Sequence, residues 1–157
     1  MFELKVVKEN DKDVLRNLLE YYLYDFNFYY EDDLNENGRF EFIDVEPYIY
    51  NNYFKAYFII VDNHYAGFVL TSFGKEKSIV EEFWIMPKYR KGMFAFEVLK
   101  KVLSEMHGKI EFVILNKNER WLKVVDYWIR KNYQVLNVEN IKKWETEDFT
   151  KYTILSM

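Results

Sequence analysis

Residues 81–95, which read EEFWIMPKYRKGMFA, decide the predicted fold of this chain. An apolar run ends at Pro87, a short basic segment follows, and a helical pattern begins at Phe94. A loop between a strand and a helix leaves several backbone N–H groups unpaired at the positive end of the helix dipole. Such a loop is a phosphate-binding arrangement.

The basic side chains of this loop strengthen the prediction. Lys88, Arg90 and Lys91 place three cations within four residues, and Gly92 lets the backbone approach a ligand closely. These features predict an anion site, with pyrophosphate as the candidate ligand. The same residues also fit a solvated basic turn that ends the strand, and the local pattern alone leaves both interpretations open.

The rest of the chain alternates apolar periods of two and of about 3.6 residues, which indicates an α/β fold. A helix is predicted after Asn10 or Asp11, either of which can cap it, with a buried stripe that ends at Leu23. The other predicted helices are 94–106 and 118–131. The predicted strands are 1–8, 54–61, 65–73, 78–86, 109–115, 133–138 and 151–157. The aromatic and acidic stretch 24–53 is expected to be irregular and partly helical.

Composition excludes several classes of protein. The 157 residues favour a single domain over 1–157, and a formal charge of −4 without a basic block argues against a nucleic-acid partner. The chain has no cysteine, and its two histidines, His64 and His107, are too far apart in sequence to predict a metal site. No apolar run is long enough to span a membrane, so a cytoplasmic protein is expected.

A resemblance to a known family adds to this picture. Residues 80–129 resemble the acetyl-CoA-binding core of the GCN5-related N-acetyltransferase (GNAT) superfamily, and in particular a branch of small, uncharacterised bacterial acetyltransferases. Residues 19–26 and 32–38 look like the N-terminal part of that branch. The resemblance implies a central mixed, mostly antiparallel sheet flanked by helices. It also implies acetyl-CoA as the acetyl donor, no metal, and direct acetyl transfer to a primary amine that the sequence does not identify.

The family's pyrophosphate loop has Gln or Arg, two free positions, Gly, one free position, then Gly or Ala. Arg90 takes the first place and Ala95 the last, while Met93 stands at the middle Gly and Gly92 lies one residue early. Either Met93 crowds the pyrophosphate or Gly92 supplies the close approach. The cofactor-binding residues that the resemblance implies are Trp84, Ile85 and Met86 for the pantetheine arm, Arg90, Lys91, Gly92, Met93, Phe94 and Ala95 for the loop, and Asn118 for the arm.

Several of these residues also have another interpretation besides a role in binding the cofactor. Trp84 and Phe83 also fit a core or cleft wall, Asn118 also fits a helix N-cap, and Asn116 competes with Asn118 for the same role.

Acetyl transfer requires a proton acceptor for the amine and a proton for the leaving thiolate. Glu82, and with less support Glu81, is the candidate general base, and at most one of them is expected to face a cleft because consecutive strand residues point to opposite faces. The alternative interpretation is a solvated pair of carboxylates at the strand end. The family often places an acidic Tyr where this chain has Trp128, so the adjacent Tyr127, or water, is the candidate acid.

A surface for a cationic amine, small or protein-borne, is predicted from the carboxylates of residues 25–46 and the aromatic rings beside them, which are Tyr21, Tyr22, Tyr24, Phe28, Tyr29 and Tyr30. An exposed acidic loop over an aromatic core fits the same residues. Two alternatives to the enzyme stay open: a catalytically degenerate GNAT-fold module that binds acyl-CoA or a partner, and an interaction module unrelated to coenzyme A. Exposed aromatic strands are also compatible with a homodimer.

Overall fold

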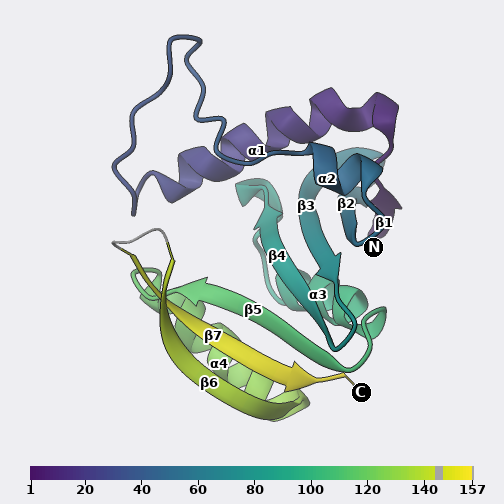
Figure 1. Ribbon diagram of the computed structural model, residues 1–157, viewed down its shortest axis with the longest axis vertical. Coiled ribbons are helices and arrows are strands. Elements are labelled where there is room, and N and C mark those ends of the chain that lie inside the picture. The colour runs from purple at the N-terminus through teal and green to yellow at the C-terminus, as the bar shows by residue number, and fades with distance from the viewer. Residues whose placement is uncertain (144–146, 157) are drawn as a thin grey trace. The chain divides into compact units, whose positions relative to one another are not determined.

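Helices and strands follow one another along the chain as the apolar periods predict (Figure 1). The computed structural model describes residues 1–143 and 147–156. Its elements are β1 (Glu3–Val6), η1 (Glu9–Asp11), α1 (Lys12–Phe26), α2 (Glu46–Tyr50), β2 (Phe54–Val61), β3 (His64–Phe73), β4 (Lys77–Ile85), η2 (Pro87–Tyr89), α3 (Phe94–Ser104), β5 (Lys109–Leu115), α4 (Glu119–Asn132), β6 (Gln134–Lys143) and β7 (Glu147–Leu155). Both η elements are short 3-10 helices.

The strands hydrogen-bond in the order β1-β2-β3-β4-β5-β7-β6. β4 and β5 pair in parallel, with Ser78 opposite Ile110. The pairings of β1 with β2, of β5 with β7 and of β6 with β7 are antiparallel. The predicted α/β class, with a mixed and mostly antiparallel sheet flanked by helices, is therefore confirmed.

The chain divides into two units. The first comprises residues 1–71 and 82–98, and the second comprises residues 72–81 and 99–157. β4 and α3 each contribute residues to both units. The expectation of a single domain over residues 1–157 stays a prediction.

α1 supplies much of the core of the first unit. Leu15, Leu19 and Tyr22 recur at helical spacing on its inner face, and all three are buried. They pack with Phe58 of β2 and Phe68 of β3 in one apolar cluster. The buried stripe predicted for this helix is confirmed, because the stripe and the strand face together remove a continuous apolar surface from water.

The hairpin between β2 and β3 turns at Asp62 and Asn63. Both residues have positive φ, 49° and 65°, as the central pair of a type I′ turn requires. Asn and Asp tolerate this conformation better than other non-glycine residues. The predicted hairpin is therefore confirmed, and β3 begins at His64, one residue earlier than expected.

Gly67 of β3 lies against β4. A Cβ atom at Gly67 would overlap with the carbonyl oxygen of Trp84. A glycine inside a strand often marks such a close approach of two backbones.

The second unit has a sheet face covered by α4 (Figure 1). Ile110 of β5 lies opposite Ile154 of β7, and both are fully buried. The ring of Tyr152 stacks on Phe112 at 5.3 Å, and its hydroxyl donates to Asp126 of α4 at 2.8 Å. Burial and the Asp126 carboxylate together raise the pKa of Tyr152, so the hydroxyl remains a donor at neutral pH.

Element boundaries differ from the sequence prediction at the end of the chain. β6 continues to Lys143 although the prediction stopped at Val138, and β7 begins at Glu147 although the prediction began at Lys151. The added residues are mostly polar, so they lack the alternation that identifies a half-buried strand. Met157, which the prediction included, lies outside the described residues.

Two helix ends also differ. Asp11 stands at the N-cap of α1, but its carboxylate accepts from the Lys8 N–H at 3.2 Å and not from the helix. α3 ends at Ser104 although the prediction extended to Met106, and Gly108 follows with φ of 73°.

Within residues 1–143 and 147–156, no helix is both long and apolar enough to cross a membrane.

Candidate functional site

The loop between β4 and α3 is built from backbone turns. η2 follows Met86, and the N–H of Arg90 donates to the carbonyl of Pro87 at 3.1 Å. Gly92 then has φ of 57°, and a Cβ atom there would meet nothing within 4 Å. This left-handed conformation suits glycine, and the open space beside Gly92 leaves its backbone accessible to a ligand.

α3 begins at Phe94, two residues after this glycine. The Glu97 N–H donates to the Met93 carbonyl at 3.0 Å, which is the start of the helical ladder. The first turn of a helix leaves N–H groups without helical partners, and the helix dipole adds positive potential there. Lys88 and Lys91 are exposed beside this turn. The residues present therefore fit the predicted anion site.

Aromatic packing holds the loop in place. Phe94 makes an edge contact with Phe2 at 5.7 Å between ring centroids and a tilted contact with Tyr89 at 6.4 Å. The Lys88 ammonium lies 5.4 Å from the centroid of the Tyr89 ring. Ala95 is partly buried and Met93 is 57% exposed, so the Met93 side chain extends into solvent.

Arg90 contacts α1 and the end of β4. Its Nε donates to the Ile85 carbonyl at 2.6 Å, and its Nη2 donates to Oδ2 of Asp25 at 2.5 Å. The same Asp25 oxygen accepts from the Trp84 indole N–H at 2.7 Å. Asp25 belonged to the predicted acidic surface, but no local pattern indicated this bridging role.

Two of the groups proposed for the pantetheine arm already have partners in the first unit. The Met86 N–H donates to the Ala66 carbonyl at 2.8 Å, and the Ile85 carbonyl accepts from Arg90. The Trp84 side chain is 6% exposed and lies in the apolar cluster with α1. Trp84 is therefore a core residue, as its alternative interpretation held, and an arm-binding role for its backbone stays a prediction.

The two glutamates of β4 have different partners. The hydroxyl of Tyr22 on α1 donates a hydrogen bond to Oε2 of Glu82. Glu81, which belongs to the second unit, accepts from Ser72 Oγ at 2.7 Å. Burial raises the pKa of Tyr22 well above its ordinary value, and the negative charge of Glu82 adds to this effect. The Tyr22 hydroxyl therefore stays protonated at neutral pH and can donate to Glu82.

The remaining predicted residues lie in the second unit. Asn118 occupies the N-cap of α4, but its side chain makes no capping hydrogen bond. The Asn116 side chain donates from Nδ2 to Asn140 Oδ1 at 3.0 Å and accepts at Oδ1 from the Thr150 hydroxyl at 2.6 Å. Tyr127 is 69% exposed, with the Lys131 ammonium 5.8 Å from its ring centroid.

Trp128 is 9% exposed and contacts the Tyr133 ring at 5.4 Å. The residue that the resemblance aligns with the family's acidic Tyr is therefore a buried indole, and Tyr127 next to it is exposed.

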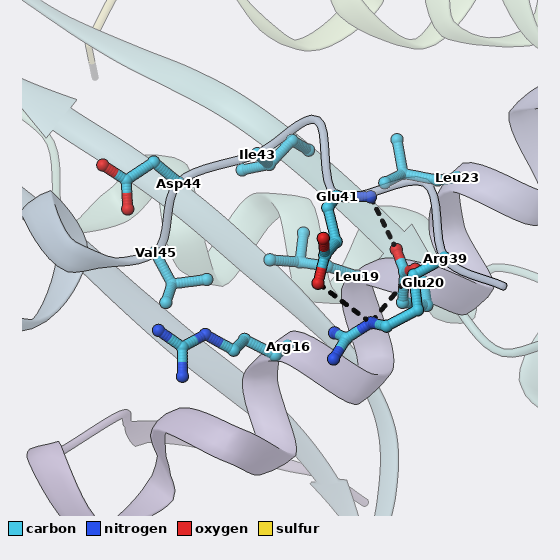
Figure 2. Close-up of a pocket in the computed structure, with 9 residues that line it drawn as sticks. All are labelled: Arg16, Leu19, Glu20, Leu23, Arg39, Glu41, Ile43, Asp44 and Val45. Carbon is cyan, nitrogen blue, oxygen red and sulfur yellow. Dashed lines mark hydrogen bonds and ion pairs between the residues drawn. The ribbon is translucent and has the colours of Figure 1, made fainter. Parts of the chain in front are cut away.

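A small cavity lies between α1 and residues 39–45 of the acidic segment (Figure 2). Glu20 anchors the segment, because its carboxylate accepts from the backbone N–H of Phe40 at 2.7 Å and from Arg39 Nε at 3.4 Å. Glu41 has φ of 48° and pairs with Arg39 at 3.5 Å. The lining residues are Arg16, Leu19, Glu20, Leu23, Arg39, Glu41, Ile43, Asp44 and Val45.

This cavity measures about 140 Å³, below the roughly 300–1,000 Å³ of typical ligand pockets. Arg39 lies between Glu20 and Glu41 in Figure 2, so the charges on this side of the cavity are paired. These contacts hold the segment on α1, and the cavity that they enclose is smaller than a typical ligand pocket.

The structure of this chain is similar to solved structures of acetyltransferases, whereas its sequence matches no known family. No protein-family model matches the chain, and no curated protein matches its sequence. An acetyltransferase from Thermus thermophilus is similar in structure, with a TM-score of 0.68, 12% identity, and coverage of 99% of this chain and 97% of that one. A GNAT-family acetyltransferase from Bacillus cereus has a TM-score of 0.60, 15% identity, and coverage of 100% and 99%.

The spermidine N-acetyltransferase of Vibrio cholerae, crystallised with CoA and spermine, has a TM-score of 0.67, 15% identity, and coverage of 99% and 95%. These likenesses confirm that the chain has the fold of the GCN5-related N-acetyltransferases.

Proposed function

We propose that this chain is an N-acetyltransferase that holds acetyl-CoA at the loop of residues 86–95 and acetylates a primary amine by direct transfer. The observation that carries the proposal is the open backbone at Gly92, two residues before α3 begins and beside two exposed lysines. The fold, and the CoA complex of the Vibrio cholerae neighbour, support the same cofactor.

The roles of the residues follow from this arrangement. When bound, acetyl-CoA supplies an acyl group activated as a thioester. The backbone N–H groups around Gly92, Met93 and Ala95, with Lys91 and the free donors of Arg90, would hold its pyrophosphate. The β4 backbone near Ile85 would hold the arm, and Asn118 remains a proposed contact.

Proton removal from the amine is assigned to Glu82. Its carboxylate is partly buried and is held in one orientation by the Tyr22 hydroxyl, as a positioned general base requires. Glu81 is the weaker candidate because Ser72 already binds it. Water is the proton source that best suits the leaving thiolate, because Tyr127 is exposed and Trp128 has no acidic proton of use.

The acceptor is proposed to be a cationic amine. Residues 20–46 contain nine carboxylates and a single basic residue, Arg39, in a chain of formal charge −4. Polyamines are the acceptors named for the Vibrio cholerae neighbour, which supports testing them first. Another structure of that enzyme is dodecameric, which supports testing self-association of this chain by light scattering.

The experiment is a screen for thiol release. The purified chain is incubated with acetyl-CoA and a panel of spermidine, spermine, smaller diamines and lysine peptides. Amine-dependent release of free CoA, lost in Glu82→Gln, is the expected result. Release that is equal with and without every amine would contradict the proposal.

A second candidate function is a module that binds acyl-CoA or a partner without turnover. The observation that favours it is the buried Trp128 at the family's acid position. Tight binding of acetyl-CoA without release of thiol for any amine would select this second function.

A further inference from the structure

We propose that Asp25 is a positioning residue that acts on cofactor binding through Arg90. This inference rests on the proposed acetyl-CoA site at residues 86–95. Asp25 lies on α1, 65 residues before Arg90 in the sequence, and its carboxylate links that helix to the loop.

A buried ring fixes the carboxylate of Asp25. Oδ2 accepts from the Trp84 indole N–H at 2.7 Å, and the Trp84 ring packs against Phe68 at 6.0 Å within the apolar cluster. The Tyr21 ring also stacks on the Trp84 ring, with 6.3 Å between the centroids. Because the indole cannot turn without disturbing these contacts, the carboxylate has one preferred position.

That carboxylate in turn fixes Arg90. The guanidinium is held at two points, by Asp25 through Nη2 at 2.5 Å and by the Ile85 carbonyl through Nε at 2.6 Å. A guanidinium has five N–H donors, so these two contacts leave the others unused by any acceptor among the described residues. The Arg90 side chain is 45% exposed, which leaves those donors accessible from solvent.

The consequence is preorganisation. An arginine that is already ordered loses little conformational freedom when it binds a phosphate, whereas a free arginine must be ordered at the moment of binding. Asp25 therefore raises the affinity of the loop only while Arg90 is present.

Two other roles for Asp25 predict different results. If Asp25 only stabilises the fold, its removal should weaken binding equally with or without Arg90. If Asp25 competes with the phosphate for Arg90, its removal should strengthen binding.

The test is a double-mutant cycle measured by calorimetric titration of acetyl-CoA into the full chain. We expect Asp25→Ala to raise Kd about tenfold in the Arg90 background and less than about twofold in the Arg90→Ala background. The matched control is Asp13→Ala, which also removes a carboxylate of α1. The Asp13 side chain is 91% exposed, so this variant should leave Kd unchanged.

Asp25→Asn separates folding from positioning. The amide oxygen still offers an acceptor to the Trp84 indole, so its urea unfolding should stay near wild type, while the loss of charge weakens the hold on Arg90 and raises Kd. Equal effects of Asp25→Ala in both backgrounds, unchanged binding, or tighter binding would each overturn the inference. Failure of the wild type to bind acetyl-CoA would overturn the proposed function as well, which makes the two failures distinguishable.

Discussion

The hydroxyl of Tyr22 on α1 donates a hydrogen bond to the carboxylate of Glu82 on β4. Tyr22 is 7% exposed and packs against Phe26 and Phe68 at 4.7 and 5.6 Å. The candidate general base is therefore held by a residue whose own position is fixed by the core.

Replacing Tyr22 by Phe should destabilise the first unit. The change leaves the Glu82 carboxylate without this donor, and hydrogen bonds to charged groups contribute about 1.5–3 kcal/mol. Urea unfolding measures the loss. Tyr24→Phe is the matched control, because its side chain is 61% exposed, and it should change the free energy of unfolding by less than about 0.5 kcal/mol. Equal effects of the two variants would contradict the prediction.

The same pair predicts a pH dependence. The folded chain keeps the Tyr22 proton above the ordinary pKa of 10.0, whereas the unfolded chain loses it there. The contribution of Tyr22 to stability is thus constant below pH 10.0 and decreases above it, by up to about 1.4 kcal/mol per pH unit. The pKa values of Tyr133 and Tyr152 are also raised, but both residues are present in the wild type and in Tyr22→Phe, so their effect is the same in the two. Tyr22→Phe should therefore show a shallower loss of stability at alkaline pH, and parallel curves would refute the assignment.

Gly67 sets the spacing of β3 and β4. Gly67→Ala would place a Cβ on the Trp84 carbonyl oxygen and force the two strands apart, at a cost of about 3 kcal/mol or more. Gly38→Ala is the control, because its Cβ would meet nothing within 4 Å and only its φ of 72° is unfavourable, at about 1–2 kcal/mol. Thermal unfolding of both variants checks the order, and a smaller loss for Gly67→Ala would contradict it.

The two explanations of the loop, close approach at Gly92 or crowding by Met93, predict opposite effects of substitutions on acetyl-CoA binding. If Gly92 supplies the close approach, Gly92→Val should weaken acetyl-CoA binding at least about tenfold, because a branched side chain disfavours its positive φ. Met93→Gly should then change Kd less than about threefold, since Met93 already extends into solvent and is flexible. Calorimetric titration measures both. Much tighter binding by Met93→Gly would show instead that Met93 crowds the cofactor.

The Glu82 assignment predicts a split between turnover and binding. Glu82→Gln retains an acceptor for the Tyr22 hydroxyl but cannot take a proton, so kcat should fall by about a hundredfold with Kd for acetyl-CoA unchanged. Glu81→Gln, on the adjacent residue with its Ser72 partner, is the control and should retain most activity. A larger loss in Glu81→Gln than in Glu82→Gln would reverse the assignment.

Local patterns predicted the elements of this fold well. β2 and β5 match the predicted ranges, and the helical stripe with Leu15, Leu19 and Tyr22 is buried as expected. These features depend on spacing within one element, which a sequence displays directly. β6 and β7 were predicted too short because their polar ends, such as Asn140 and Lys142, form ladders that alternation does not reveal.

The candidate site was only partly predictable for the same reason. The loop with Gly92 is contiguous, so its chemistry is visible in the sequence. The bonds from Tyr22 to Glu82 and from Arg90 to Asp25 join residues 60 and 65 positions apart. No local period encodes such contacts, which form only when α1 packs on the strands. Asp25 and Tyr22 were therefore predicted only as part of the acceptor surface, and their bonds to Arg90 and Glu82 were not predicted.

Calorimetric titration of acetyl-CoA into the purified chain, after any co-purified cofactor has been removed, tests the central claim most directly. We expect saturable binding with a Kd of roughly 1 µM to 1 mM, the usual range for enzyme substrates. Arg90→Ala should weaken it by about 1.5–3 kcal/mol, whereas Lys100→Ala, an exposed cation on α3, should leave it unchanged. No binding by the wild type, or equal affinity in Arg90→Ala, would contradict the assignment of this loop as the cofactor site.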